Sequence, residues 1–214
     1  MKRVFIIDDH PILREGLRRL LESQPGFEIC GEASVAAGLT ERILQLKPDL
    51  LIMDIALPDK SGLELIKDLQ SIGSNVPILV FSMHDEMLYA ERALRAGAKG
   101  YLMKGSGADS LATAIKTVVA GNHYLSQRVS SHILASLSGK RKAGNLPIER
   151  LTDRELQIFE LIGRGATVAR IAEQLHISPK TVEAHRGNMK TKLDLADAAR
   201  LMREAVIWVE LSAG

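Results

Sequence analysis

Five residues with complementary chemistry close apolar runs in the first half of the chain. They are Asp8, Asp9, Asp54, Ser82 and Lys104, and the runs are VFIIDD, DLLIMD, VPILVFS and KGYLMK. Each run has the length and composition of a buried strand. Because the carboxyl ends of parallel strands share one edge of a sheet, we expect the five side chains to converge in one pocket there.

Three carboxylates in one pocket repel one another unless a cation lies among them. Oxygen ligands favour a hard ion, most simply Mg²⁺. Beside it, Lys104 and Ser82 can hold a phosphoryl group. A single aspartate at a strand end is most often only a turn former, but five such positions together favour a functional site. His10 has two interpretations, a ligand for a softer metal or a residue at the start of the helix that Pro11 begins.

Length and composition predict a protein of one or two domains without disulfides. The chain has 214 residues and one cysteine, Cys30, which we interpret as a small buried apolar side chain rather than a reactive thiol. The N-terminus lacks the apolar run of a signal peptide, and no stretch approaches the ~20 apolar residues of a membrane span. We therefore expect a cytoplasmic protein that does not bind membranes.

Charge differs between the two parts of the chain. Residues 1–125 carry 14 Lys+Arg and 16 Asp+Glu, and residues 126–214 carry 14 and 10, so that the net charges are −2 and +4. This difference predicts a first domain that handles a cation and a second domain that meets nucleic acid.

Strand-like and helix-like patterns alternate through residues 1–125. Recurring leucines follow Pro11 at helical spacing, and further helices are expected at 36–46, 62–69, 86–96 and 108–120. The alternation predicts a doubly wound, five-stranded parallel sheet with helices on both faces. Residues 126–146 are predicted to be a linker, helical in part over 127–137. Its cluster Lys140-Arg141-Lys142 either touches DNA phosphates or is simply solvated.

The pattern of residues 147–214 predicts an all-helical domain of four helices. Thr152 and Glu155 have the spacing of a capping box, and Gly163 and Gly165 are expected to end that helix. A second helix leads through a short turn at 176–178 into a third, for which Ser178 is the N-cap and Pro179 the first residue. These two helices form either a helix-turn-helix or a plain helical hairpin with a basic, solvated face.

Two known modules resemble these segments. The motifs DDHP at Asp8, LPDKSG after Asp54, Ser82 and YLMK at Tyr101 resemble the receiver domain of two-component response regulators, which has a flavodoxin-like sheet, over residues 2–121. LTDRELQIFELIGRG and IAEQLHISPKTVEAHRGNMKTKL resemble the LuxR-type DNA-binding module of the NarL/FixJ class, over residues 151–211.

The receiver resemblance implies a role for each pocket residue. Asp54 is the implied phosphoacceptor. The implied Mg²⁺ ligands are Asp9, Asp54 and the backbone carbonyl of Ala56, with Asp8 acting through water. Lys104 pairs with the phosphoryl group, while Ser82 and Tyr101 are the switch hydroxyl and the switch aromatic.

The LuxR-type resemblance implies that the helix over 179–193 enters the major groove of double-stranded DNA. Projection around this helix turns Val182, Met189 and Leu193 toward the core. The residues expected at the DNA are Lys180, Thr181, Glu183, Ala184, His185, Gly187, Lys190 and Thr191. His185 lies close to the core side of the helix, so it is equally well predicted to pack in the core. Glu183 departs from the family, which commonly has a lysine there, and Val168, Ala169 and Arg170 depart as well.

The last helix, expected over 196–211, is apolar on two faces. One carries Leu201, Ala205 and Trp208, and the other carries Met202, Val206 and Val209. The second face either meets another copy in a homodimer or closes a single monomeric core.

These patterns favour a transcriptional response regulator that a sensor histidine kinase phosphorylates on Asp54. We expect no enzymatic activity beyond slow self-dephosphorylation. One alternative is an aspartate-nucleophile phosphatase, although such enzymes usually carry Asp-x-Asp where Asp8 and Asp9 are adjacent here. Another is an interaction protein that makes no use of phosphorylation.

Overall fold

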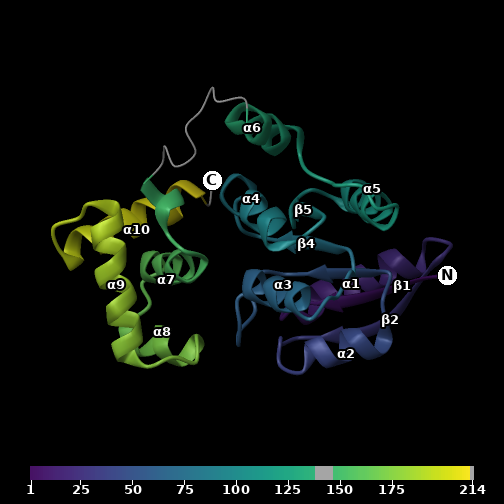
Figure 1. The fold of residues 1–214 in the computed structure, drawn as a ribbon, viewed down its shortest axis with the longest axis horizontal. Helices are drawn as coiled ribbons and strands as arrows, with labels where there is room; N and C mark the ends of the chain where they lie inside the picture. Colours follow the sequence, from purple (N-terminus) through teal and green to yellow (C-terminus); the bar gives the residue numbers. More distant parts are fainter. Residues whose placement is uncertain (138–146, 213–214) are drawn as a thin grey trace. The chain divides into compact units, whose positions relative to one another are not determined.

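Five parallel strands form the centre of the first part of the chain in the computed structural model, which describes residues 1–137 and 147–212. The sheet order is β2-β1-β3-β4-β5, the flavodoxin-like arrangement, which confirms the predicted fold. The strand bounds are β1 Lys2–Ile7, β2 Phe27–Ala33, β3 Leu50–Met53, β4 Ile78–Ser82 and β5 Gly100–Met103. Figure 1 shows the sheet and the helices around it.

A helix follows each strand, as the alternation of patterns predicts. The helices are α1 Pro11–Glu22, α2 Leu39–Leu46, α3 Gly62–Ser71, α4 Glu86–Ala96 and α5 Ala108–Val119. Proline suits the first position of α1, because its missing N–H would have no helical partner there. The side chain of Asp85 caps α4 by accepting a hydrogen bond from the N–H of Met87 at 2.8 Å.

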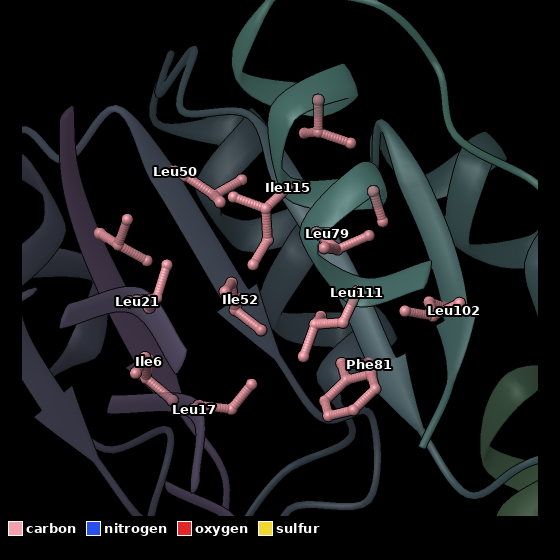
Figure 2. Packing of buried hydrophobic residues seen from close by; sticks show 13 residues of the cluster. Ile6, Leu17, Leu21, Leu50, Ile52, Leu79, Phe81, Leu102, Leu111 and Ile115 are labelled. Carbon is pink, nitrogen blue, oxygen red and sulfur yellow. The ribbon is translucent and has the colours of Figure 1, made fainter. Parts of the chain in front are cut away.

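Strands β1, β3, β4 and β5 are buried on both faces over most of their length, so their residues alternate between two apolar layers, whereas the edge strand β2 is only half-buried. Ile6 and Ile52 belong to the layer that α1 and α5 cover, where Leu17 and Leu111 pack (Figure 2). Each fully buried leucine or isoleucine contributes roughly 1.5–3 kcal/mol. The carboxyl ends of the strands are therefore held in place by closely packed apolar layers.

The chain returns to the outer edge of β5 after α5. Tyr124 forms a parallel bridge with Gly100, and its backbone carbonyl accepts the N–H of Tyr101 at 3.0 Å. Helix α6, Gln127–Leu137, then begins the predicted linker with the helical segment expected there. The rest of that linker, 138–146, with the cluster Lys140-Arg141-Lys142, lies outside the described residues.

The second part of the chain is helical. Its elements are the 3-10 helix η1 Pro147–Arg150 and the α-helices α7 Asp153–Gly163, α8 Val168–Gln174, α9 Pro179–Leu193 and α10 Ala198–Ser212. Contacts within the chain divide it into two compact units, Met1–Leu134 and Ala135–Gly214. No helix in the described ranges is long and apolar enough to cross a membrane.

The capping box that starts α7 is confirmed. Thr152 Oγ1 accepts the N–H of Glu155 at 3.3 Å, and the Glu155 carboxylate accepts the N–H of Thr152 at 2.7 Å. Gly165, at φ +80°, lies beyond the end of the helix, as expected. Gly163 has another role, because a Cβ there would lie 2.3 Å from the carbonyl oxygen of Ala205. Only glycine permits α7 and α10 to approach so closely.

The turn between α8 and α9 forms where it is predicted. His176 takes the left-handed conformation at φ +51°, and Ser178 Oγ accepts the N–H of Thr181 at 3.0 Å as the N-cap of α9. Helix α10 begins at Ala198 rather than at the expected position 196. Asp197 accounts for the difference, because its side chain accepts the N–H of Arg200 at 2.8 Å and so holds the preceding chain outside the helix.

Candidate functional site

Acidic side chains meet at the carboxyl edge of the sheet because of strand register. Ile7 of β1 pairs with Met53 of β3, so the residues that follow them, Asp8 and Asp54, lie side by side. Ligand atoms of these two aspartates, of Asp9 and of His10 all lie within 4.8 Å of one another. Asp8 and Asp54 are only 1% and 2% exposed, whereas Asp9 and His10 face solvent.

Lys104 supplies a positive charge between the two buried carboxylates. Its Nζ lies 2.7 Å from Asp8 Oδ2 and 2.5 Å from Asp54 Oδ2, and its side chain is 5% exposed. The residue reaches this place because its own N–H donates to the carbonyl of Ser82 at 2.9 Å, where β5 ends beside β4. Burial opposes the charged form, but the charge and hydrogen bonds of the aspartates raise the pKa of Lys104 above its ordinary value.

Asp54 accepts hydrogen bonds on both carboxylate oxygens. Ser82 Oγ donates to Oδ1 at 2.7 Å, the N–H of Ala56 donates to the same atom at 3.1 Å, and Lys104 donates to Oδ2. Burial acts to raise the pKa of Asp54, but the charge and hydrogen bond of Lys104, with the hydrogen bond of Ser82, outweigh it and lower the pKa. The carboxylate is therefore ionised at neutral pH and held in one orientation, as a nucleophile requires.

The loop after Asp54 turns back tightly. Ala56 bridges to Ser61, and α3 begins at Gly62. A Cβ at Gly62 would lie 2.5 Å from Ile55 Cα and 2.7 Å from the Asp54 carbonyl oxygen, so this turn needs glycine. The LPDKSG motif thus places Ala56 two residues from Asp54 with its N–H directed at the carboxylate.

Ser82 and Tyr101 both point inward. Ser82 is fully buried against Asp54, and Tyr101 is buried with its hydroxyl donating to the carbonyl of His84 at 2.9 Å. The His84 ring lies 4.8 Å from the Tyr89 ring, measured between centroids. The predicted switch pair is therefore joined through the loop that connects β4 to α4.

The donor set fits a hard divalent cation. Carboxylate oxygens of Asp9 and Asp54 lie near one another, while Lys104 already balances part of the charge of Asp8. His10 lies at the start of the helix, as one of the two predicted alternatives has it. It is the N-cap residue of α1, and its Nδ1 lies 2.7 Å from Asp9 Oδ1 and 3.1 Å from Asp8 Oδ1.

Helix α9 presents most of the predicted DNA-facing residues to solvent. Lys180, Thr181, Glu183, Ala184 and Thr191 are exposed, whereas Gly187, Lys190 and His185 are half-buried. The Nδ1 atom of His185 is buried without a hydrogen-bond partner, which places that nitrogen on the core side of the helix.

Two charge pairs on α9 are absent from the sequence-based expectations. Arg186 Nη1 donates to Glu183 Oε1 at 2.6 Å, and the spacing i, i+3 is the signal that would have found this pair. Lys192 donates to the buried carboxylate of Glu155 at 2.6 Å, a contact between α9 and α7 that no local pattern indicates. Burial acts to raise the pKa of Glu155, but the hydrogen bonds of Lys192 and Thr152 outweigh it and lower the pKa.

The second face of α10 is covered only in part. Met202 is exposed, and Val206 and Val209 are half-buried. Val209 packs on α7, because its Cγ2 lies 2.6 Å from the position of a Cβ on Gly163. Val209 therefore packs within its own unit, while Met202 faces solvent.

Two families match the two parts of the chain. Residues 4–116 match the family described as "Response regulator receiver domain", and residues 149–205 match "Bacterial regulatory proteins, luxR family". The chain is a response regulator. The predicted membership of the NarL/FixJ class, with a receiver domain and a LuxR-type DNA-binding domain, is confirmed, and so is its role as a transcription regulator.

Relatives of similar length match nearly the whole chain. "Transcriptional regulatory protein DegU" of Brevibacillus brevis is 31% identical over 225 residues, which cover 98% of this chain and 95% of the relative. "Response regulator UvrY" of Escherichia coli (strain K12) is 32% identical over 206 residues, which cover 96% and 94%. Among solved structures, RcsB from Salmonella enterica serovar Typhimurium, bound to promoter P1flhDC in the presence of phosphomimetic BeF3−, matches with a TM-score of 0.68. It is 26% identical and covers 95% of this chain and 98% of that one.

Proposed function

We propose that a sensor histidine kinase phosphorylates this response regulator on Asp54, and that the modification alters its dimerisation and its binding to DNA. The observation that carries the proposal is the Asp54 carboxylate itself. It is buried, ionised and oriented by Ser82, Ala56 and Lys104 at the edge of the sheet.

Transfer breaks the phosphorus–nitrogen bond of a phosphohistidine and forms a phosphorus–oxygen bond to Asp54. A Mg²⁺ ion held by Asp9, Asp54 and the carbonyl of Ala56, with Asp8 acting through water, would supply the charge that the incoming group requires. Lys104 donates to the carboxylate that reacts, so its ammonium group is placed to move onto a phosphoryl oxygen. The hydroxyl of Ser82 is placed to do the same from the other side.

We propose slow self-dephosphorylation as the only further chemistry. Ala56, two residues after Asp54, has no polar side chain with which to orient a water molecule. His84, two residues after Ser82, packs against Tyr89. Neither residue is placed as an evident base, which favours a phosphorylated form that persists rather than a phosphatase that turns over.

The DNA ligand is proposed to lie along the exposed side of α9. Lys180, Thr181 and Thr191 are exposed there, and the related RcsB was solved bound to a promoter in the presence of a phosphomimetic. Exposed Met202 of α10, with half-buried Val206 beside it at i, i+4, offers an apolar contact for a second copy. A homodimer on double-stranded DNA would place two copies of α9 on two half-sites. Such a ligand also implies that the protein acts in the cytoplasm.

The test is labelling by acetyl phosphate with and without Mg²⁺, followed by intact mass. The wild type is expected to gain one phosphoryl group only with Mg²⁺. Asp54→Asn is expected to gain none, and Asp9→Asn to need more Mg²⁺. Asp109→Asn, at an exposed position in α5, is the matched control. Undiminished labelling of Asp54→Asn would refute the acceptor assignment, and continuous phosphate release without a labelled intermediate would favour the phosphatase.

A further inference from the structure

The first turn of α6 is tied to the first turn of α4 by one hydroxyl group. Ser126 Oγ donates to Glu86 Oε1 at 2.7 Å and accepts the N–H of Val129 at 3.2 Å. Ser126 therefore caps α6 and binds α4 at the same time. Helix α4, Ser126 and residues 127–134 of α6 all belong to the compact unit Met1–Leu134.

The chain that leads into α6 is also bonded to the switch residue Tyr101. The N–H of Tyr101 donates to the carbonyl of Tyr124, and the N–H of Tyr124 donates to the carbonyl of Lys99, both at 3.0 Å. Only Leu125 separates Tyr124 from Ser126. A movement of Tyr101 thus acts directly on the backbone that positions the α6 cap.

The same two points of attachment lead back to Asp54. Ser82 bonds to Asp54, and His84 accepts from the Tyr101 hydroxyl. Glu86, the first residue of α4, lies two residues after His84. Ser82 and Tyr101 are fully buried, so neither can shift without displacing its neighbours. Two short paths therefore connect Asp54 with the start of α6. One runs from Ser82 along the chain to Glu86, and the other runs through Tyr101 to Tyr124.

Helix α6 depends on this attachment for its order. One face carries Val129, His132 and Ile133, which are buried or half-buried, while Leu134 on the other side is exposed. An isolated helix of 11 residues is marginal in water, so contacts at its first turn decide how far it is formed. In sequence, α6 is the segment that leads out of the receiver toward the DNA-binding unit.

We propose that the hydrogen bond from Ser126 to Glu86 is a latch that transmits phosphorylation of Asp54 to the linker helix. With Ser82 bound to the phosphorylated aspartate and Tyr101 buried, residues 84–86 are held where Glu86 accepts from Ser126, and α6 is docked on the receiver. Without the phosphoryl group this segment moves more, the bond is formed for a smaller fraction of the time, and the first turn of α6 opens more often. The proposal rests on the proposed function of Asp54.

Hydrogen exchange of the full chain, with and without Mg²⁺ and BeF3−, tests the latch. In the wild type, BeF3− is expected to slow exchange of the amides in 127–134 about five- to tenfold, the effect of one hydrogen bond to a partly buried carboxylate. Glu86→Ala removes the acceptor and is expected to abolish this slowing. Glu86→Gln, which keeps an acceptor oxygen, is the matched control and is expected to retain most of it.

A second variant separates the latch from the helix cap. Ser126→Asp retains an acceptor for the N–H of Val129 but has no proton to donate to Glu86, and it is expected to lose the response to BeF3−. The latch is refuted if BeF3− protects 82–88 in the wild type while 127–134 does not change, or if Glu86→Ala responds as the wild type does. If acetyl phosphate fails to label Asp54, the proposed function itself is wrong, and the latch falls with it.

Discussion

Replacement of the buried Lys104 by methionine is expected to destabilise the receiver unit more than replacement of an exposed lysine such as Lys116. The ammonium group lies between Asp8 and Asp54, which are both nearly inaccessible to water. Removal of one partner from a buried ion pair costs about 3–5 kcal/mol, because the remaining charge is left uncompensated. Here Ser82 and Ala56 still donate to Asp54, and the N–H of His10 still donates to Asp8, so we expect ~3 kcal/mol.

Urea unfolding of the full chain measures this effect with an internal reference. Trp208, the single tryptophan, lies in α10 and reports the DNA-binding unit by fluorescence, while far-UV circular dichroism also follows the receiver. With an m value of about 2 kcal/mol/M, a loss of ~3 kcal/mol lowers the receiver midpoint by ~1.5 M and leaves the Trp208 transition unchanged. Lys116→Met, at an exposed position in α5, is the control and is expected to change stability by less than about 0.5 kcal/mol.

The loss of stability in Lys104→Met is expected to depend on pH. In the wild type, Lys104 holds the pKa of Asp54 below its ordinary value, so the stabilisation from that carboxylate is present at neutral pH and is lost only as pH falls through the lowered pKa. In Lys104→Met, only the hydrogen bonds of Ser82 and Ala56 still oppose burial, so the pKa of Asp54 is expected to rise relative to wild type. The defect of the variant is therefore expected to be largest at pH 7, and to shrink as pH falls toward about 5 or as Mg²⁺ is added. A midpoint equal to that of wild type, or a defect that neither acid nor Mg²⁺ reduces, would refute this reasoning.

Three further predictions concern other parts of the chain. Glu155→Gln is expected to lower the stability of the DNA-binding unit by about 1–2 kcal/mol at pH 7, measured by Trp208 fluorescence. Because the pKa of Glu155 is lowered in the folded state, the difference should vanish as pH falls through that pKa, and a defect that persists in acid would contradict the ion pair with Lys192. Ala56→Asn is expected to shorten the lifetime of phosphorylated Asp54 several-fold. An unchanged rate of phosphate loss in Mg²⁺ would show that Ala56 does not slow the hydrolysis. Glu183→Lys is expected to tighten binding to scrambled DNA and to steepen the slope of log affinity against log salt concentration by roughly one unit. If the affinity for scrambled DNA does not rise, Glu183 lies away from the duplex.

The pocket could be predicted from the sequence because parallel strands leave little choice of geometry. Once β1 and β3 pair as neighbours, the residues that follow Ile7 and Met53 must lie side by side. Both of these residues are aspartates, which predicts a cation-binding pocket. Capping rules were equally reliable at Thr152 and Ser178, since a cap depends only on residues within one turn.

Contacts between distant elements could not be predicted in this way. Ser126 and Glu86 are 40 residues apart, and Lys192 and Glu155 are 37 apart, so no periodic pattern connects them. The apolar second face of α10 predicted a contact beyond the first face, either with another copy or within one core, and could not decide between the two. That Val209 packs on α7 follows from the close approach at Gly163, which requires the tertiary structure.

The most direct test of the central claim is the affinity of the full chain for DNA before and after phosphorylation. DNA is first selected from a random pool, and binding is then measured for wild type and Asp54→Asn, with acetyl phosphate and Mg²⁺ or without them. We predict that phosphorylation changes the affinity of the wild type about tenfold or more, a coupling of roughly 1.4 kcal/mol, and leaves Asp54→Asn unchanged. An equal response in both proteins, or no response in a fully labelled wild type, would contradict control of DNA binding through Asp54.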